Sequence, residues 1–252
     1  TFTLKEYDVL VRFLREWVKP KNVSQFRNAV KSYGNKDNSI KKLNAMELEM
    51  EKHRRVIIRE LILIASNSGL RCPKEILSIK WGDVKLRKQE MEGMYGANKK
   101  TEELVSTIQV NEQQKTGSRL VVCLAGTYFK RLRQYYVDTF DYTPKDNDPV
   151  FLEMFGRRKG SVLCKYALYR TWAELIRDAG LDRMKFTLYH LRHFSITQQI
   201  LNGVDLILIA KNMGNSINTI TKHYEHVDME KNSRKLIMRR NTRIEMSDEV
   251  SW

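Results

Sequence analysis

The sequence predicts a mainly α-helical protein with one small three-stranded antiparallel sheet, an α+β fold. Glycine and proline together make up 16 of the 252 residues, about half their average share, which disfavours a sandwich of many tightly turned strands. Apolar residues recur at helical spacing in the first and last parts of the chain. Short strand-like runs are confined to the middle.

Each helix is predicted from a local signal. The first begins at a capping box formed by Thr3 and Glu6 and ends before Pro20. A long helix is expected to end at Gly69, a suitable C-cap, and Pro73 suits the first turn of a short helix that follows. That short helix is expected to end near residues 81–83, and 21–42 are expected to be a short helix or loop. The remaining predicted helices cover about 44–67, 126–139, 164–179, 187–201, 205–213, 216–226 and 229–240.

The middle of the chain is predicted to form the sheet. Strand-like runs cover 84–86, 104–110 and 119–124. Lys115 lies in a Lys-Thr-Gly turn between the last two runs. A hairpin tip there could carry its ammonium group into a groove, although a Lys-Thr-Gly turn is most often simply solvated.

The net charge of +15 indicates a polyanionic partner, and nucleic acid is the usual one. A solvated basic surface is the alternative interpretation. The longest apolar run, Leu61 to Ala65, is too short for a membrane span. The three cysteines lie far apart without metal-ligand spacing, which favours a reducing, cytosolic setting.

Three stretches carry residues suited to chemistry on phosphate. Arg71 lies where one helix ends, and Glu75, one turn later, could hold it in a bidentate pair. The Lys115 turn is the second stretch. The third stretch contains Tyr189, His190, Arg192 and His193, and it continues to Gly214-Asn215 and Tyr224. Each stretch alone fits an ordinary surface pair, turn or helix face.

Together, these residues resemble the tyrosine recombinases, the phage-integrase-like enzymes of DNA strand transfer. The order is arginine, lysine, Tyr/His-x-Arg, Gly-Asn and tyrosine, and the ten-residue interval from Gly214 to Tyr224 matches the family spacing. Leu191-Arg192-His193 and Gly203-Val-Asp205 also fall where the family has its Leu-Arg-His and Gly-x-Asp motifs. The resemblance extends over nearly the whole chain.

The Arg71 stretch carries an apparent one-residue insertion at Cys72-Pro-Lys74, and two further positions differ from the family pattern. The family histidine three residues before the second arginine is replaced by Tyr189, and the histidine is displaced by one position to His190. The residue after Gly214, usually histidine and sometimes tryptophan, is Asn215. We expect Tyr189 to face the phosphate and His190 to be auxiliary or structural, because one residue turns a helical side chain by about 100°.

The resemblance implies a role for each residue. Tyr224 is the expected nucleophile that forms a 3′-phosphotyrosyl bond, Arg71 and Arg192 are expected to clamp the phosphate, and Lys115 is expected to protonate the leaving 5′ oxygen. Asn215 is expected to donate a hydrogen bond to the phosphate. The auxiliary candidates are Glu75, His190 and His193. No metal, cofactor or ATP is expected, since the sequence shows neither a metal cage nor a phosphate-binding glycine loop.

The resemblance further implies a site-specific recombinase acting on double-stranded DNA during integration or excision of a phage or mobile element. Residues 1–252 would then be a single catalytic domain, the C-terminal part of a longer integrase whose N-terminal DNA-clamping domain is absent. Assembly as a homotetramer on DNA is expected. The basic segment 229–240 is the candidate for a segment passed to a neighbouring chain, and the alternative is a helix packed on its own domain. A cytoplasmic, nucleoid-associated location in a bacterial or phage-infected host is also expected. The alternatives are a DNA-binding protein without strand transfer and a type IB topoisomerase-like relaxing enzyme.

Overall fold

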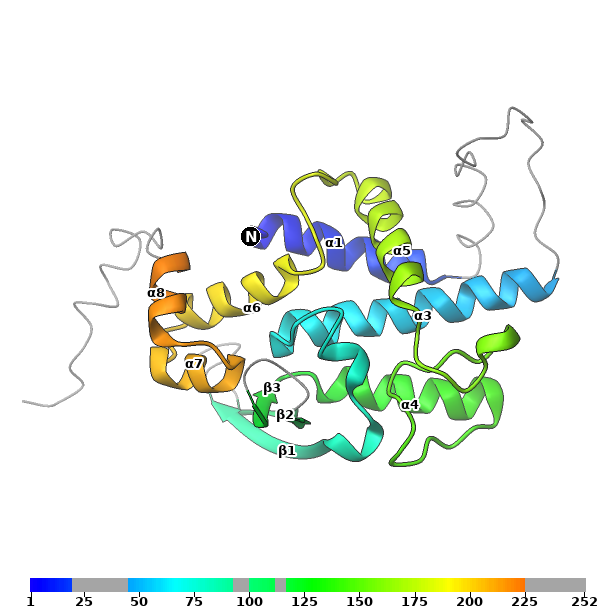
Figure 1. The fold of residues 1–252 in the computed structure, drawn as a ribbon, viewed down its shortest axis with the longest axis horizontal. Helices are drawn as coiled ribbons and strands as arrows, with labels where there is room; N and C mark the ends of the chain where they lie inside the picture. Colours follow the sequence, from blue (N-terminus) through cyan, green and yellow to red (C-terminus); the bar gives the residue numbers. More distant parts are fainter. Residues whose placement is uncertain (20–44, 93–99, 112–116, 225–252) are drawn as a thin grey trace, which may run out of the picture.

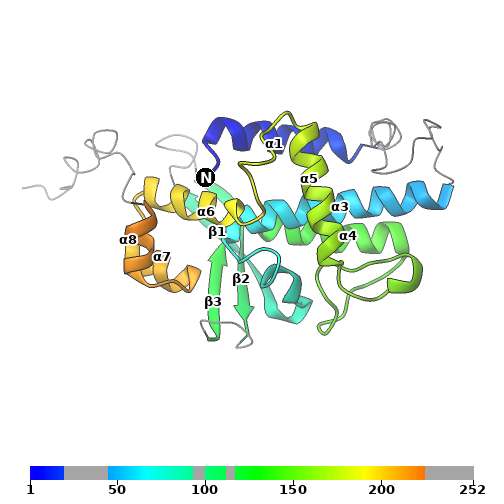
Figure 2. The same cartoon turned by 45° about the horizontal axis from the view of Figure 1, so that its top comes forward.

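The computed structural model describes residues 1–19, 45–92, 100–111 and 117–224. Two helices, α3 and α4, run side by side through the middle, α1 and α5 lie over them on one side, and α6 to α8 form one end of the molecule (Figures 1 and 2). The helices are α1 (Leu4–Trp17), α3 (Ala45–Ser68), α4 (Gly126–Phe140), α5 (Lys165–Asp178), α6 (His190–Leu201), α7 (Leu206–Met213) and α8 (Ile217–Tyr224).

The predicted three-stranded antiparallel sheet is confirmed, in the order β1 (Val84–Glu92), β2 (Lys100–Val110) and β3 (Arg119–Cys123). The first two strands are longer than predicted. Their extensions are polar, and cross-strand charge pairs such as Lys88 with Glu102, at 2.6 Å, fall within them. A pattern of apolar residues locates the buried part of a strand and misses such a polar extension.

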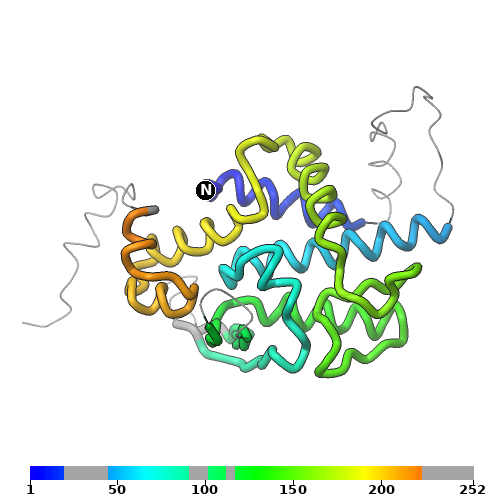
Figure 3. Tube along the Cα trace, in the orientation of Figure 1, coloured from blue at the N-terminus to red at the C-terminus, as the bar shows by residue number. Residues whose placement is uncertain are grey.

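A main apolar core connects α1, α3, α4, α5 and the sheet. The N-terminal segment packs beside the chain that leads into α6, where Phe2 stacks on Phe186 at a centroid distance of 4.1 Å (Figure 3). A second, smaller apolar cluster joins α6, α7 and α8. Its members are Ile196, Ile209, Ala210, Met213 and Ile220. This second cluster sets the position of α8, which ends at Tyr224.

The predicted short helix after Pro73 is wrong. The chain there forms two 3₁₀ turns, η1 (Ile76–Ser78) and η2 (Trp81–Asp83). Between them Ile79 is extended, and its carbonyl accepts a hydrogen bond from the Val150 N–H at 3.0 Å. Pairing with this distant segment replaces the local bonds that a continuous helix would need.

The helix predicted from residue 187 begins at His190. The preceding turn is held by the Thr187 N–H, which donates to His190 Nδ1 at 3.1 Å, so a side chain takes the place of a helical backbone partner. The helices predicted over 44–67, 126–139, 164–179 and 205–213 agree with the structure within two residues at each end. The predicted segments 21–42 and 229–240, and Lys115, lie outside the described residues.

In the part of the chain that the structure describes, every helix is too short or too polar to cross a membrane.

Candidate active site

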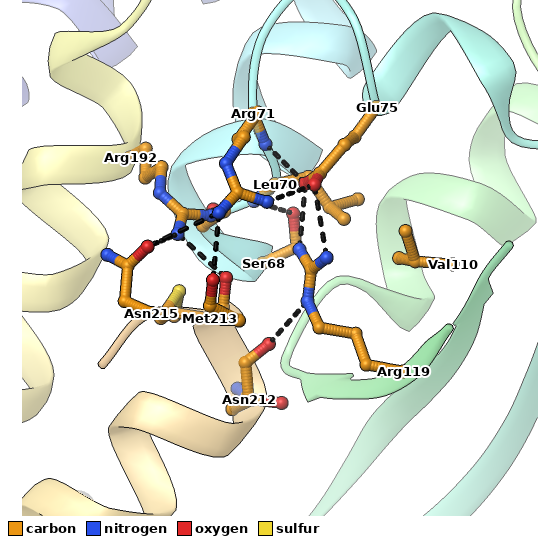
Figure 4. Close-up of polar contacts among 12 residues, drawn as sticks. Ser68, Leu70, Arg71, Glu75, Val110, Arg119, Arg192, Asn212, Met213 and Asn215 are labelled. Atoms are coloured by element: carbon orange, nitrogen blue, oxygen red, sulfur yellow. Dashed lines mark hydrogen bonds and ion pairs between the residues drawn. The ribbon is translucent and has the colours of Figure 1, made fainter. Parts of the chain in front are cut away.

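A network of polar contacts joins the end of α3, β3, the start of α6 and the connection between α7 and α8 (Figure 4). Four of the residues singled out from the sequence meet there: Arg71, Glu75, Arg192 and Asn215. Arg71 and Asn215 are 144 residues apart in the chain, yet Arg71 Nη2 donates to Asn215 Oδ1 at 3.3 Å. The fold therefore assembles one site from separate motifs.

Arg192 is completely buried on α6 and is held at the C-terminal ends of two helices. Its Nη1 donates to the carbonyl oxygen of Gly69, just after α3, at 2.6 Å, and its Nη2 donates to that of Met213, the last residue of α7, at 2.7 Å. Carbonyl groups at helix C-termini carry partial negative charge and stabilise a cation. Burial, together with the charge of Arg71, lowers the pKa of Arg192 to about 10, so the group stays protonated at neutral pH.

Two of the five N–H donors of Arg192 make no hydrogen bond with the described residues. The bonds to Gly69, Met213 and Asn215 use three donors, the last at 3.1 Å. Among the described residues, its buried Nε has no hydrogen-bond partner. A buried donor without a partner is costly, and a phosphate oxygen would satisfy it.

Asn215 joins the two arginines, because its Oδ1 accepts from Nη2 of both Arg71 and Arg192. Arg71 also donates from Nη2 to the carbonyl oxygen of Gly214 at 2.8 Å. With Oδ1 facing the arginines, the amide nitrogen of Asn215 is the end that can donate to a bound anion.

Glu75 anchors the first arginine from a buried position. Its carboxylate accepts from Arg71 Nη1 and, at 2.9 Å, from the Arg71 backbone N–H. Burial alone raises the pKa of Glu75, but hydrogen bonds from Arg119 and from the Arg71 backbone hold it below its ordinary value. The carboxylate therefore remains ionised at neutral pH.

Arg119, which the sequence analysis did not single out, completes the network. It is the first residue of β3, and its guanidinium donates from Nη1 and Nη2 to the two carboxylate oxygens of Glu75, at 3.0 and 2.7 Å. A signal was present in the sequence. Strand alternation puts Arg119 on the same face as the buried Val121 and Cys123, and an inward-facing arginine needs a carboxylate partner.

The network has an excess of positive charge. Three guanidinium groups, those of Arg71, Arg119 and Arg192, face one carboxylate, that of Glu75. In the described part of the chain, no group of three or more histidine, cysteine, aspartate or glutamate side chains could hold a metal ion. Guanidinium groups match the geometry of phosphate, so the arrangement is suited to bind a phosphodiester.

The rings at the start of α6 differ in their surroundings. Tyr189 is 42% exposed, and its ring makes an edge contact with His193 at a centroid distance of 4.9 Å. His190 instead accepts the Thr187 backbone N–H at Nδ1, and its ring lies 6.1 Å from that of Phe186. Burial lowers the pKa of His190. Its neutral ring is thus oriented by the turn that begins the helix.

The side chains of two predicted site residues are not among those that the structure describes. Tyr224 is the last residue of α8, and the position of its side chain lies outside the described part. Lys115 also lies outside the described residues. Their catalytic roles, like those of the other candidates, remain predictions.

Comparisons with known proteins find one family model and several solved structures that are similar to this chain. The family model of the phage integrase family matches residues 36–231. The XerH site-specific recombinase bound to palindromic difH substrate, in a post-cleavage complex, has a TM-score of 0.59 and 21% identity over 94% of this chain and 52% of that one. The pre-cleavage complex of XerH with difH gives a TM-score of 0.56 and 23% identity over 92% and 51%.

The chain thus spans about half the length of XerH, and at this identity the similarity shows the fold. No curated protein sequence matches the chain significantly.

Gly214 offers a test of how tightly this network is packed. It has a φ of 65°, and an added Cβ would lie 2.9 Å from Arg119 Cδ. Gly203 has a similar φ of 76°, with no atom within 4 Å of an added Cβ. Both alanine variants incur the left-handed backbone cost of about 1–2 kcal/mol, but only Gly214→Ala also displaces Arg119.

We therefore expect urea unfolding to show a greater loss of stability for Gly214→Ala than for Gly203→Ala. Equal losses would mean that the Arg119 side chain moves aside without cost.

Proposed function

The chain belongs to the phage integrase family, the tyrosine recombinases, and from this premise we propose that it cleaves and rejoins DNA at specific sites through a 3′-phosphotyrosyl intermediate. The observation that carries the proposal is the pair formed by the half-buried Arg71 and the buried Arg192, which Asn215 bridges and which has an excess of positive charge. Such a cluster is costly to bury unless it serves an anion.

Binding of the scissile phosphate uses the two arginines. Arg192 offers its remaining donors from a frame fixed by Gly69 and Met213, and Arg71 is held by Glu75. Two guanidinium groups on the non-bridging oxygens stabilise the charge that develops at phosphorus. Preorganised donors of this kind contribute about 3–4 kcal/mol each to transition-state stabilisation.

The covalent step falls to Tyr224. Its phenolic oxygen forms a bond to phosphorus while the bond from phosphorus to the 5′ oxygen breaks. A free phenol has a pKa of about 10, so roughly one in a thousand is ionised at neutral pH. The tyrosine proton must be removed and the leaving oxygen must be protonated, and we assign the second task to Lys115. Attack by a 5′-hydroxyl on the phosphotyrosine reverses the step and rejoins a strand.

Asn215 and Tyr189 replace histidines of the family pattern. Asn215 donates a neutral hydrogen bond where a protonated histidine would add charge, so it clamps the phosphate less strongly. Tyr189 occupies the exposed position at the start of α6, while the His190 ring is engaged by Thr187. This arrangement supports Tyr189 as the donor near the phosphate and His190 as a structural group.

The partner is double-stranded DNA that carries the recombination site, and four chains assemble on two such duplexes. The chain acts as the C-terminal catalytic part of a longer integrase, in the cytoplasm of a bacterial or phage-infected host. Neither a metal ion nor ATP takes part, because the arginines and Lys115 supply the positive charge.

The nucleophile is tested with Tyr224→Phe, which removes only the attacking oxygen. A nicked suicide duplex is first selected from a random-sequence library by covalent capture on the wild-type protein. In EDTA, the wild-type protein should form a covalent adduct with this duplex. The variant should form none while its affinity for the duplex stays within a few-fold. Adduct formed by the variant would exclude Tyr224. Duplex binding by wild type without any adduct would instead indicate a DNA-binding protein.

The roles of the two rings are separated by Tyr189→Phe and His190→Ala on the same duplex. Loss of the Tyr189 hydroxyl should slow adduct formation by roughly 10²-fold, the range for one oriented donor or proton-transfer partner. Single-turnover rates should show a smaller loss for His190→Ala. The opposite order would assign the proton transfer to the histidine.

Assembly is tested by removing residues from Met229 onward, with a chain that ends after Arg240 as the control. The segment is basic and carries the apolar pair Leu236 and Ile237, so its loss should weaken assembly on paired sites more than binding to one site. Sedimentation with one-site and two-site duplexes measures both. Equal weakening of the two would mean that the segment serves its own domain.

A further inference from the structure

Each of the three guanidinium nitrogens of Arg119 donates a hydrogen bond within the protein. Besides the two bonds to Glu75, its Nε donates to the carbonyl oxygen of Asn212 at 3.2 Å, and its side chain is 8% exposed. Figure 4 shows the group between Glu75 and the end of α7. The Glu75 carboxylate and the Asn212 carbonyl thus hold all three nitrogens, and the bidentate pair with Glu75 directs Arg119 toward that carboxylate.

The bonds of Arg119 connect three parts of the site. Through Glu75 it reaches Arg71, because the same carboxylate accepts from both guanidinium groups. Through Asn212 it reaches α7, and the Asn212 side chain clamps β3 by two bonds to the Val122 backbone, at 2.8 and 3.1 Å.

Arg119 also packs on Gly214, where an added Cβ would meet its Cδ, Nε and Cζ at 2.9 to 3.1 Å. The Gly214 carbonyl binds Arg71, and Asn215 follows directly. Helix α8, which ends at Tyr224, begins three residues after Gly214.

We propose that Arg119 is a positioning residue for DNA cleavage, which fixes Glu75 and the Gly214–Asn215 backbone so that Arg71 and Asn215 meet the scissile phosphate in the reactive geometry. This inference rests on the proposed function. Arg119 acts through Glu75 and touches neither DNA nor the reacting atoms. A displacement of about 1 Å in a group that orients a substrate can cost 10²-fold in rate, so loosening Glu75 affects cleavage more than binding.

The chain contains a matched control pair. Arg131 on α4 donates from Nε and Nη2 to the two carboxylate oxygens of Glu60 on α3, at 2.9 and 2.6 Å, and Glu60 is fully buried. This pair is also bidentate, although Arg131 uses Nε and Nη2 and is 43% exposed, and it makes no contact with Arg71, Arg192 or Asn215 among the described residues. Loss of Arg131 therefore reports the structural cost alone.

The experiment compares Arg119→Gln, Arg119→Lys, Arg131→Gln and Glu75→Gln. Single-turnover adduct formation is measured on the captured suicide duplex, with duplex affinity and unfolding in urea measured in parallel. Arg119→Gln should form adduct about 10²-fold more slowly than wild type, with affinity within a few-fold. Arg119→Lys should recover part of the rate, since one ammonium retains the charge but cannot bridge both oxygens. Arg131→Gln should retain the wild-type rate.

The pH profile gives a readout that a purely structural role would not change. Arg71 and Arg119 face the Glu75 carboxylate directly, Arg192 lies behind them, and Lys80, Asp83 and Asp146 line a cavity of about 430 Å³ beside it. Hydrogen bonds from Arg119 contribute to the lowered pKa of Glu75. Without Arg119 that pKa rises, so the carboxylate becomes protonated at a higher pH and releases Arg71 there.

The adduct rate of Arg119→Gln should therefore fall at a higher pH on the acid side than that of wild type. Arg131→Gln should keep the wild-type profile. In the Glu75→Gln background, further loss of Arg119 should add little to the rate defect.

Several results would overturn the inference. One is that folded Arg119→Gln keeps the wild-type rate and pH profile. Another is that Arg119→Gln and Arg131→Gln lose the same amount of rate. A third is that the rate defects of Arg119→Gln and Glu75→Gln add fully in the double variant. If Arg119→Gln does not fold, Arg119→Lys carries the same comparison. Absence of adduct with wild type would count against the proposed function, whereas a normal wild-type adduct with unaffected Arg119 variants would count against Arg119 alone.

Discussion

The site depends on one interaction, the sharing of the Glu75 carboxylate between Arg71 and Arg119. Each carboxylate oxygen accepts a guanidinium N–H, and the Arg71 backbone adds another bond. A buried ion pair that loses one partner destabilises a protein by about 3–5 kcal/mol, a large fraction of the 5–15 kcal/mol typical of a domain. The same contact holds the end of α3 against β3, so stability and site geometry depend on one group.

The positive charge of Arg192 is buried with carbonyl and amide oxygens as its hydrogen-bond partners among the described residues. Its guanidinium lies where α3 and α7 both end, and it takes carbonyl oxygens of Gly69 and Met213 in place of an anion. Helix ends supply only partial charges, so the cation is stabilised without being neutralised. A formal ion pair at this position would compete with a phosphate, whereas carbonyl oxygens leave the positive charge available to it.

Glycine makes this arrangement possible at two points. Gly69 ends α3 in a left-handed conformation, and an added Cβ there would lie 2.3 Å from the sulfur of Met213. Gly214 ends α7 in the same conformation against Arg119. The close approach of α3, β3 and α7 therefore requires residues without side chains. It also explains how motifs far apart in the chain come to share one polar network.

The sequence by itself determined the fold class, the order of the main elements and the family, because apolar periodicity, capping signals and motif spacing are local properties. It also indicated Arg71, Glu75, Arg192 and Asn215, since each lies in a recognisable motif. Strand alternation indicated that Arg119 faces inward, but only the tertiary structure decided that it belongs with them, because its partner Glu75 is 44 residues away in the chain. The turn that engages His190 and the polar extensions of the sheet were likewise decided by contacts that no local pattern of apolar residues records.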